Sequence, residues 1–456
     1  MNTYIIVGII LVALVALLAT NKKLVETLKN IYKIEELRQR ILFTLGLLLI
    51  YRLGSFVTLP GVDHAVLEQW TQNFANDGSS LMGLLNIFSG GAFSQASIFA
   101  LGVMPYITAS IIIQLLGIMV PYFRKMQREG ESGRRKMNQW TRFLTIAVLL
   151  LQAPAYLATQ VISSGAVVAN GDFLGIANGQ FIVPAVIILI AGTMFIMWLG
   201  EKITDRGIGN GISLIIMIGI VARLPQSFLQ ELMFQTTGGG SIIMLLVELV
   251  FLALVFMLAI AIVQAVRKIP VQYAKRIVGN KQYGGVRQYI PLKLNAANVM
   301  PIIFAQALMF IPGLIWGGQW LDITSFWYNF TLVVLVIAFT YFYTAIIVNP
   351  QMMADDMKRN GGFIPGVKPG KSTVTYIDDI MTRITLPGSV FLAIITILPA
   401  IAMSLGITQG FAYFFGGTSL LIMVGVVLDT LKQIESYLLM RHYDGLMKTG
   451  RIQGRY

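Results

Sequence analysis

The stretch LMGLLNIFSGGAFSQASIFALGVMPYITASIIIQLL, residues 81–116, decides how the rest of the chain is read. It holds no Lys, Arg, Asp or Glu, yet Ser89, Gly90 and Gly91 separate its two apolar segments. A mid-helix glycine costs about 1 kcal/mol relative to alanine, so a plain membrane span would not need this pair. Irregular backbone persists at membrane depth only inside protein or beside a water-filled cavity. Two structures fit equally: a short plug-like helix followed by a pore-lining helix, or an outer loop leading into an ordinary helix.

The composition is that of an integral membrane protein made mostly of helices. Of the 456 residues, 56% are hydrophobic and 12% are charged, whereas soluble domains carry about 25% charged residues. The absence of cysteine excludes disulfides, thiolate metal sites and a cysteine nucleophile, and two histidines are too few for a histidine-rich metal site. We therefore expect no cofactor, no metal and no enzymatic activity.

Ten apolar segments follow an N-terminal one, and every second loop between them is basic. Basic loops remain in the cytoplasm by the positive-inside rule, which also places the C-terminus there. One segment, 212–222, is short for a span and ends at Arg223, so it must either lean on neighbouring helices or continue past Pro225. The expected spans are residues 41–58, 81–119, 143–162, 181–199, 212–222, 241–265, 298–316, 326–348, 385–404 and 412–430.

The N-terminal region predicts two further membrane elements. Residues 5–19 are continuously apolar, slightly short of the roughly 20 residues that a span needs. A secretory signal would begin with positive charge, and the first residues, MNTY, have none, so an extra inserted helix over 1–21 is favoured over a cleaved signal. Residues 22–40 alternate basic and apolar residues and predict an amphipathic helix on the cytoplasmic membrane surface.

Two long basic loops carry the remaining signals. Loop 266–297 has seven Lys and Arg and no acid, which favours a docking surface for phosphates or an acidic protein over a merely topological role. Loop 349–384 mixes both charges with glycines and prolines that predict turns at a projecting tip. Its Gly370 and Lys371 resemble the end of a Walker A loop, but Pro365 stands where that motif requires glycine.

Arg52 lies inside a predicted span. An ionisable residue within the membrane is functional by default, but snorkelling to the outer interface explains Arg52 equally well. A secondary transporter with broken helices is a rival interpretation. It would require acids within the spans, and Glu248 and Asp429 are the few candidates. A membrane enzyme is a third interpretation, for which no nucleophile or metal cluster is present.

Several stretches, in order along the chain, resemble the SecY family, the channel subunit of the bacterial Sec protein translocon. The resemblance covers roughly Lys22 to Arg455. The stretches are YRLGSF (51–56), NIFSGGAFSQASIFALGVMPYITASIIIQLL (86–116), EGESGRRK (129–136), MWLGEKITDRGIGNGIS (197–213), PVQYAKR (270–276), NPQMMADDMKRNGGFIPGVKPGKST (349–373) and GGTSLLIMVGVVLD (416–429).

The resemblance implies an all-α polytopic membrane protein with ten transmembrane helices in two inverted five-helix halves around an hourglass pore. The extra N-terminal hydrophobic helix would be an addition to that pattern. The first half would be residues 41–230, with the plug at 81–94, and the second half 231–436. Residues 437–456 would form a cytoplasmic tail.

The resemblance also implies three sets of channel residues. An aliphatic pore ring would gate by dewetting and would offer a passing chain no hydrogen bonds. Without the resemblance, each ring residue would be read as helix core. The plug would contain Leu84, Ile87, Phe88, Ser89, Gly90 and Gly91; the ring would be Val103, Ile107, Ile212, Ile216, Ile303 and Ile422; and the lateral gate, between helices 97–117 and 298–316, would hold Thr108, Gln114 and Gln306.

By the same resemblance, the chain would be a protein-conducting channel in the bacterial plasma (inner) membrane. It would pass unfolded secretory polypeptides and release apolar segments into lipid through the lateral gate. Its partners would be SecE, SecG, the SecA ATPase, the ribosome through its RNA phosphates, signal sequences, nascent polypeptides and membrane lipid. SecA or the ribosome would dock on Arg267, Lys268, Lys275, Arg276, Arg359, Lys368 and Lys371.

One position in the docking loop departs from the family pattern. The usual G-[IV]-R-P-G motif is here Gly366-Val367-Lys368-Pro369-Gly370. Lysine keeps the positive charge of arginine but lacks its bidentate fork.

Overall fold

The computed structural model describes residues 34–67, 69, 86, 88–167, 178–237, 241–273, 276–278, 281–283, 287–316 and 324–448. The predicted N-terminal segment 1–21 and most of the amphipathic helix 22–40 lie outside the described residues. The chain forms two compact units. The first comprises Met1–Asp77, Gly83–Gly240 and Val426–Tyr456, and the second comprises Gly78–Met82 and Ser241–Gly425.

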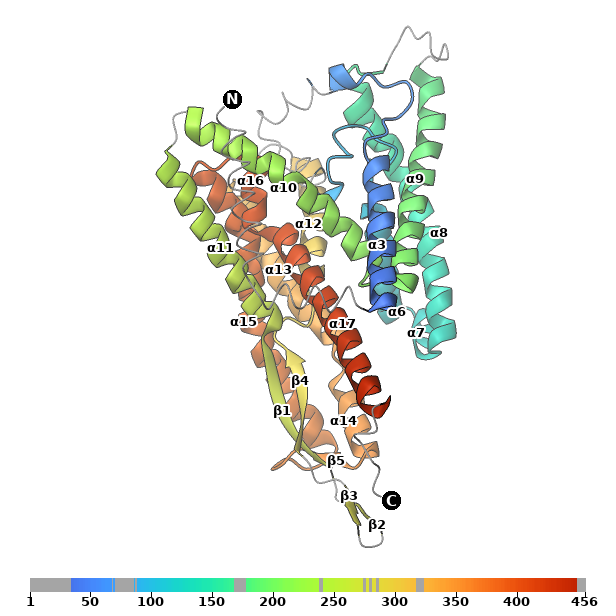
Figure 1. Cartoon of the computed structure of the whole chain (residues 1–456), viewed down its shortest axis with the longest axis vertical. Coiled ribbons are helices and arrows are strands. Elements are labelled where there is room, and N and C mark those ends of the chain that lie inside the picture. Colours follow the sequence, from blue (N-terminus) through green and yellow to red (C-terminus); the bar gives the residue numbers. More distant parts are fainter. Residues whose placement is uncertain are drawn as a thin grey trace. The chain divides into compact units, whose positions relative to one another are not determined.

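The first unit is made of long helices. The opening helix, α3, runs through the predicted boundary at residues 40 and 41 without a break. Its buried residues, Leu37, Thr44, Leu48 and Tyr51, recur at helical spacing and form one stripe. The helices are α3 (Glu35–Gly54), α6 (Met104–Met119), α7 (Pro121–Arg128), α8 (Glu131–Tyr156) continued by the π-helical η1 (Leu157–Ile162), α9 (Asn178–Arg206), α10 (Gly211–Thr237) and the later part of α17 (Gly417–Lys448) (Figure 1).

The short predicted segment at 212–222 is the beginning of a longer helix. α10 continues through Pro225 and ends at Thr237, so of the two alternatives for this segment the structure shows the extension past the proline. The missing proline N–H costs one intrahelical hydrogen bond, and the chain on both sides still remains helical.

The second unit contains the remaining helices. α12 packs on α13, and α13 packs on α15. The side chain of Asn349 caps α14 by accepting hydrogen bonds from the backbone N–H groups of Gln351 and Met352, both at 3.1 Å. The helices are α11 (Ile242–Gln264), α12 (Met300–Trp316), α13 (Phe326–Ile347), α14 (Pro350–Arg359), α15 (Lys371–Ser404), α16 (Gln409–Ala412), the 3₁₀ turn η3 (Tyr413–Phe415) and the first part of α17.

The two basic loops fold together into a small antiparallel sheet, which the sequence analysis did not predict. The strand order is β4-β1-β5, and Val266 faces Lys293 at one end of the β1–β4 ladder while Gln272 faces Arg287 at the other. In Figure 1 the β2–β3 hairpin lies at the far end of this ladder. The strands are β1 (Val266–Tyr273), β2 (Arg276–Val278), β3 (Lys281–Tyr283), β4 (Arg287–Lys293) and β5 (Gly362–Phe363).

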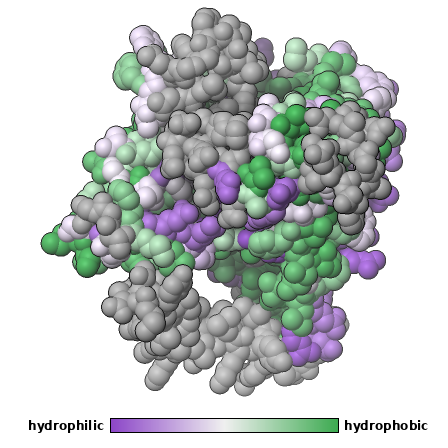
Figure 2. Space-filling view, turned by 90° about the horizontal axis from the view of Figure 1, so that it is seen from above, coloured by the Kyte–Doolittle hydropathy of each residue, from purple (hydrophilic) through white to green (hydrophobic). Residues whose placement is uncertain are grey.

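The helices have the length and surface of membrane spans. Among the described residues, seven helices are long and apolar enough to cross a membrane, or eight if the bent pair α6–α7 counts as one span. Leu151 is 78% exposed and Ile243 is 72% exposed, and in Figure 2 hydrophobic side chains reach the surface in broad patches. Such surfaces are stable against lipid or a partner. Each predicted span overlaps one of the helices, and the prediction of an all-α polytopic membrane protein is confirmed.

Candidate functional site

The glycine pair at Gly90 and Gly91 lies in a run of turns that follows Phe88. We call residues 88–97 the plug segment. Both glycines have positive φ, 66° and 98°, a conformation that costs most L-residues about 1–2 kcal/mol. Two positions that were predicted as part of the plug, Leu84 and Ile87, lie outside the described residues.

Hydrogen bonds within the plug segment fix its shape. The hydroxyl of Ser89 accepts from the backbone N–H of Phe93 at 3.0 Å. The backbone carbonyl of Asn86 accepts from the N–H of Gly91 at 2.9 Å, and the Asn86 side chain accepts from the N–H of Ser94 at 3.2 Å. The segment is therefore folded into a compact turn by its own polar groups and by those of Asn86, which precedes it.

The end of the plug segment pairs with the chain that leaves α3. The N–H of Ile98 donates to the carbonyl of Val57, and the N–H of Leu59 donates to the carbonyl of Ala96, both at 2.9 Å. This pairing places Ser97 in an antiparallel bridge with Thr58, and turns follow it over residues 98–103. The predicted pore-lining helix consequently begins at Met104 and not near residue 97.

Two tyrosines hold the plug segment from neighbouring helices. Tyr156, at the end of α8, donates to the carbonyl of Phe93 at 2.7 Å, and the two rings lie 4.8 Å apart. Tyr51 of α3 makes a longer bond, 3.4 Å, to the carbonyl of Ser89. Both tyrosines are buried, so each supplies apolar contact as well as a donor.

The plug segment touches α10 backbone to backbone. A β-carbon added at Gly90 would lie 2.8 Å from the α-carbon of Gly219, closer than real contacts allow. A β-carbon at Gly219 would lie 3.2 Å from the carbonyl oxygen of Phe88. Glycine at both positions is what allows this close approach.

Two arginines reach the plug segment. Arg52 of α3 donates from Nη1 to the carbonyl of Gly90 at 2.8 Å, and its guanidinium lies 5.0 Å from the ring centre of Phe56. Arg223 of α10 donates from Nη2 to the hydroxyl of Ser94 at 3.2 Å. We call Tyr51, Arg52, Tyr156, Gly219 and Arg223 the seat of the plug segment.

The plug segment is closely surrounded by its seat. Ala92 is 1% exposed and Phe93 is 8% exposed, so the segment is enclosed by its seat. It carries no charge of its own, and it contacts the seat both through hydrogen bonds and through the packing of Phe93 on the ring of Tyr156.

Sequence reasoning found part of the seat. It identified the glycine pair and noted Arg52 as an intramembrane cation, but it treated Arg223 only as the end of a short span. Tyr156 and Gly219 had no distinguishing signal, because a tyrosine or a glycine in an apolar helix is common. Two arginines in otherwise apolar spans were the signal that could have linked α3 with α10.

The six predicted ring residues are divided between the two units. Val103 and Ile216 are buried, and Ile212 packs against α9, since its Cγ1 lies 2.8 Å from where a β-carbon on Gly200 would be. Convergence of all six on one neck stays a prediction. Val103, Ile107, Ile212 and Ile216 belong to the first unit, and Ile303 and Ile422 belong to the second.

The predicted lateral-gate residues are divided in the same way. Thr108 and Gln114 lie on α6 of the first unit, where the hydroxyl of Thr108 donates to the carbonyl of Met104 at 3.1 Å. Gln306 lies on α12 of the second unit and accepts from the hydroxyl of Thr418 on α17 at 3.5 Å, a long hydrogen bond.

Most predicted docking residues lie on the sheet or beside it. Arg267 and Lys268 are exposed on β1, and Arg359 is exposed at the end of α14. Lys368 and Lys371 are exposed on the connection between β5 and α15 and at the first residue of α15. Arg276 lies on β2, and Lys275 lies outside the described residues.

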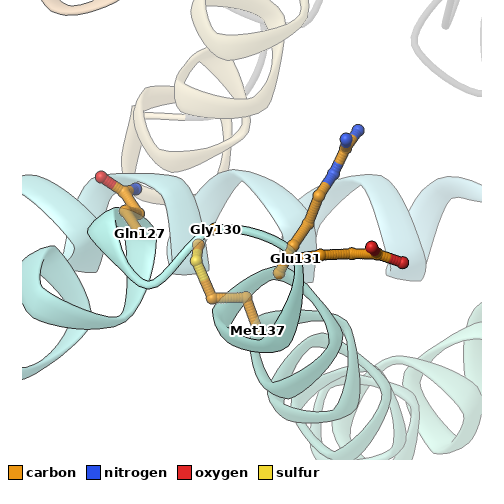
Figure 3. Close-up of a pocket in the computed structure, with 5 residues that line it drawn as sticks. Gln127, Gly130, Glu131 and Met137 are labelled. Carbon is orange, nitrogen blue, oxygen red and sulfur yellow. The ribbon is translucent and has the colours of Figure 1, made fainter.

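A pocket of about 400 Å³ lies at the turn between α7 and α8 and is not a convincing ligand site. Figure 3 shows Gln127 and Glu131 pointing away from each other, and Glu131 forms an ion pair with Arg135 at 3.0 Å. Its polar groups therefore do not converge on one point. Within the described part of the chain, no cluster of His, Asp and Glu could hold a metal ion.

Comparison with known sequences gives a consistent result. The sequence profile of the SecY family matches residues 97–431. The chain is 42% identical over 445 residues to the protein translocase subunit SecY of Corynebacterium glutamicum, and the alignment covers 91% of this chain and 98% of that protein.

Solved structures share the fold. One concerns the plug domain of the SecY protein, described as stabilising the closed state of the translocation channel and maintaining a membrane seal; it matches with a TM-score of 0.54 and 18% identity over 87% of this chain and 91% of that one. Another is Sec61 in the canine ribosome–channel complex, with a TM-score of 0.52 and 16% identity over the same shares, 87% and 91%.

Proposed function

Because this chain belongs to the SecY family, we propose that it is the protein-conducting channel subunit of a Sec translocon. It passes unfolded secretory polypeptides across the bacterial plasma membrane and releases apolar segments into lipid. It is a channel and not an enzyme, and its C-terminus faces the cytoplasm. The observation that carries the proposal is the enclosed, uncharged plug segment held in its seat by the neighbouring helices.

We propose that residues 41–230 and 231–436 are the two halves of the channel, and that the six aliphatic ring residues form the neck of its pore. An aliphatic neck stays dry and blocks ions, while it offers no hydrogen bonds that would retain a passing polypeptide. The plug segment then seals the neck when no polypeptide is present.

The lateral gate follows from the same division. We propose that α6, with Thr108 and Gln114, and α12, with Gln306, form its two edges. Separation of these helices would let an apolar signal sequence or membrane anchor partition into lipid.

We call β1, β4 and β5, together with α14 and the beginning of α15, the sheet region. We propose that it supplies the docking surface. Arg267, Lys268 and Lys371 are exposed and suited to the phosphates of ribosomal RNA or the acidic groups of SecA. We propose that SecA and the ribosome both use this surface, that SecE holds the two halves together, and that SecG lies at the periphery. Lys368 would contribute charge without the bidentate geometry of arginine.

A reconstituted system tests this function. Vesicles containing the chain with SecE, SecG and SecA should take up a secretory precursor in an ATP-dependent manner and protect it from added protease. Asn at Ile107, Ile216 or Ile303 should raise ion leak and ease the passage of a signal-defective precursor, whereas Leu at the same positions should change neither. Absence of precursor uptake, or equal behaviour of Asn and Leu, would oppose the proposal.

A further inference from the structure

Two arginines approach neighbouring residues of the plug segment from different helices. A β-carbon at Gly90 would lie 3.2 Å from Nη1 of Arg52, and one at Gly91 would lie 2.9 Å from Nη2 of Arg223. The glycine pair thus has a second role beyond its backbone conformation, because it leaves room for both guanidinium groups. The contacts differ: Arg52 reaches a backbone carbonyl, and Arg223 reaches the side chain of Ser94.

These two arginines differ from others in the chain in their partners. Arg40 pairs with Glu36 at 3.1 Å, and Arg142 pairs with Glu201 at 2.6 Å. Among the residues that the structure describes, no carboxylate lies within ion-pair distance of Arg52 or Arg223. Their acceptors are neutral oxygens, and Arg52 adds the ring of Phe56 and a 3.5 Å contact with the hydroxyl of Ser55.

A half-buried cation without a carboxylate depends on the hydrogen bonds that remain. Bonds from a charged donor are roughly twice as strong as bonds between neutral groups, and a buried cation that loses them is costly. The plug segment supplies one acceptor to each arginine, the carbonyl of Gly90 and the hydroxyl of Ser94. Its withdrawal removes both acceptors together and leaves two like charges facing the vacated space.

We propose that Arg52 and Arg223 are positioning residues that hold the plug segment in its seat and draw it back after a polypeptide has passed. The proposal rests on the proposed function, and it decides between the two interpretations of Arg52. If Arg52 merely snorkelled to the outer interface, its replacement would leave the plug segment undisturbed. The neutral acceptors suit this role, since a carboxylate on the plug segment would hold it too strongly to open.

The absence of cysteine from the chain allows a direct test. A single cysteine in place of Ala92, which is 1% exposed, reports whether the plug segment is seated. The full channel complex is reconstituted in vesicles, and the rate of labelling by a membrane-impermeant maleimide is measured. Arg52→Met and Arg223→Met should each speed labelling about tenfold, since each removes a bond from a charged donor, and the double variant should exceed either.

Matched variants separate positioning from general damage. Arg52→Lys should restore slow labelling in large part, because the charge and one donor remain, and Arg40→Met at the opposite end of α3 should change nothing. Ser94→Ala removes the acceptor of Arg223, so Arg223→Met should add little in a Ser94→Ala background. A purely structural role for Arg223 would give the same increase in both backgrounds. Arg223→Gln, which keeps a donor without charge, serves if the methionine variant does not assemble.

Unchanged labelling in Arg52→Met and in Arg223→Met would overturn the proposal, as would equal effects of Arg223→Met with and without Ser94. Deletion of residues 84–93 is measured in parallel for ion leak. If that deletion leaks but the arginine variants label slowly, only the arginine proposal fails. If the arginine variants label quickly but the deletion does not leak, the arginines hold a segment that is not the seal, and the proposed function of the plug segment fails instead.

Discussion

The plug segment and the sheet region are held in place by different combinations of contact. The plug segment has no charged side chain, and arginines and tyrosines of the neighbouring helices hold it through hydrogen bonds. The sheet region carries exposed charge, and it is held from within by an apolar core. That core contains Ile269, Val271, Leu292, Met357, Ile364, Ile377 and Met381.

The difference indicates which region is suited to move. Hydrogen bonds can be exchanged for bonds to water at a net cost of about 0.5–1.5 kcal/mol each, and of the plug side chains that face the seat only Phe93 is a large apolar one, so we expect the plug segment to be the easier of the two to displace. Exposing an apolar core costs about 25 cal/mol for each Å², so the sheet region should stay folded while a partner pulls on it. We therefore expect the plug segment to move during transport and the sheet region to stay folded.

Truncation of the sheet core should have the largest effect. Ile377→Ala removes a side chain of α15 that is fully buried in the core of the sheet region. This should destabilise the region by about 2–4 kcal/mol. Limited proteolysis should then cut the loops around residues 266–293 faster, with no rise in ion leak. Met352→Ala, at a position that is 61% exposed, should leave the cleavage rate unchanged; equal rates in the two variants would show that no such core exists.

Gly90→Ala should have the next largest effect, and it acts on the plug segment. The positive φ costs alanine about 1–2 kcal/mol, and the contact with Gly219 adds to that cost. We expect the resting ion leak in planar bilayers to rise about tenfold or more. Gly165 has a similar φ of 69° with open space around it. Gly165→Ala therefore introduces the same backbone strain without a close contact, and it should not raise the ion leak. A raised leak in both variants would show that backbone strain alone causes the effect.

Tyr156→Phe should have a smaller effect of the same kind. It keeps the ring packed at a tilt against Phe93 and removes one donor, which leaves the Phe93 carbonyl without that bond. A loss of about 1 kcal/mol should raise the resting leak a few fold. A leak equal to that of Gly90→Ala would contradict this, because the Tyr156 hydroxyl would then stabilise the closed state by more than one ordinary hydrogen bond.

Charge reversal on the sheet should leave its fold intact. Arg267 and Lys268 are exposed on β1, so Glu at both positions should not change the proteolysis pattern. Binding of ribosomes or SecA should weaken, and the salt dependence of binding should become shallower because fewer contacts are screened. If the binding affinity changes neither with salt nor with charge reversal, these residues serve only to orient the chain in the membrane.

The sequence predicted the helices well and the sheet poorly. Long apolar runs such as 242–264 determine helices almost independently of context, whereas Ile269 and Val271 give only two alternating positions around Pro270, too short a signal for a strand. The glycine pair was identified because it breaks an apolar pattern. The seat was not, because the contacts of Tyr156 and Arg223 with the plug segment join residues that are far apart in the chain and whose pairing only the fold defines.

The central claim is that the plug segment seals the channel at rest. Deleting residues 84–93 in the reconstituted complex and recording planar-bilayer conductance without a polypeptide tests it most directly. The account predicts a channel that still assembles and still passes precursors, with a resting ion conductance well above that of the intact chain. A deletion variant that assembles and conducts no more ions than the intact chain would contradict it.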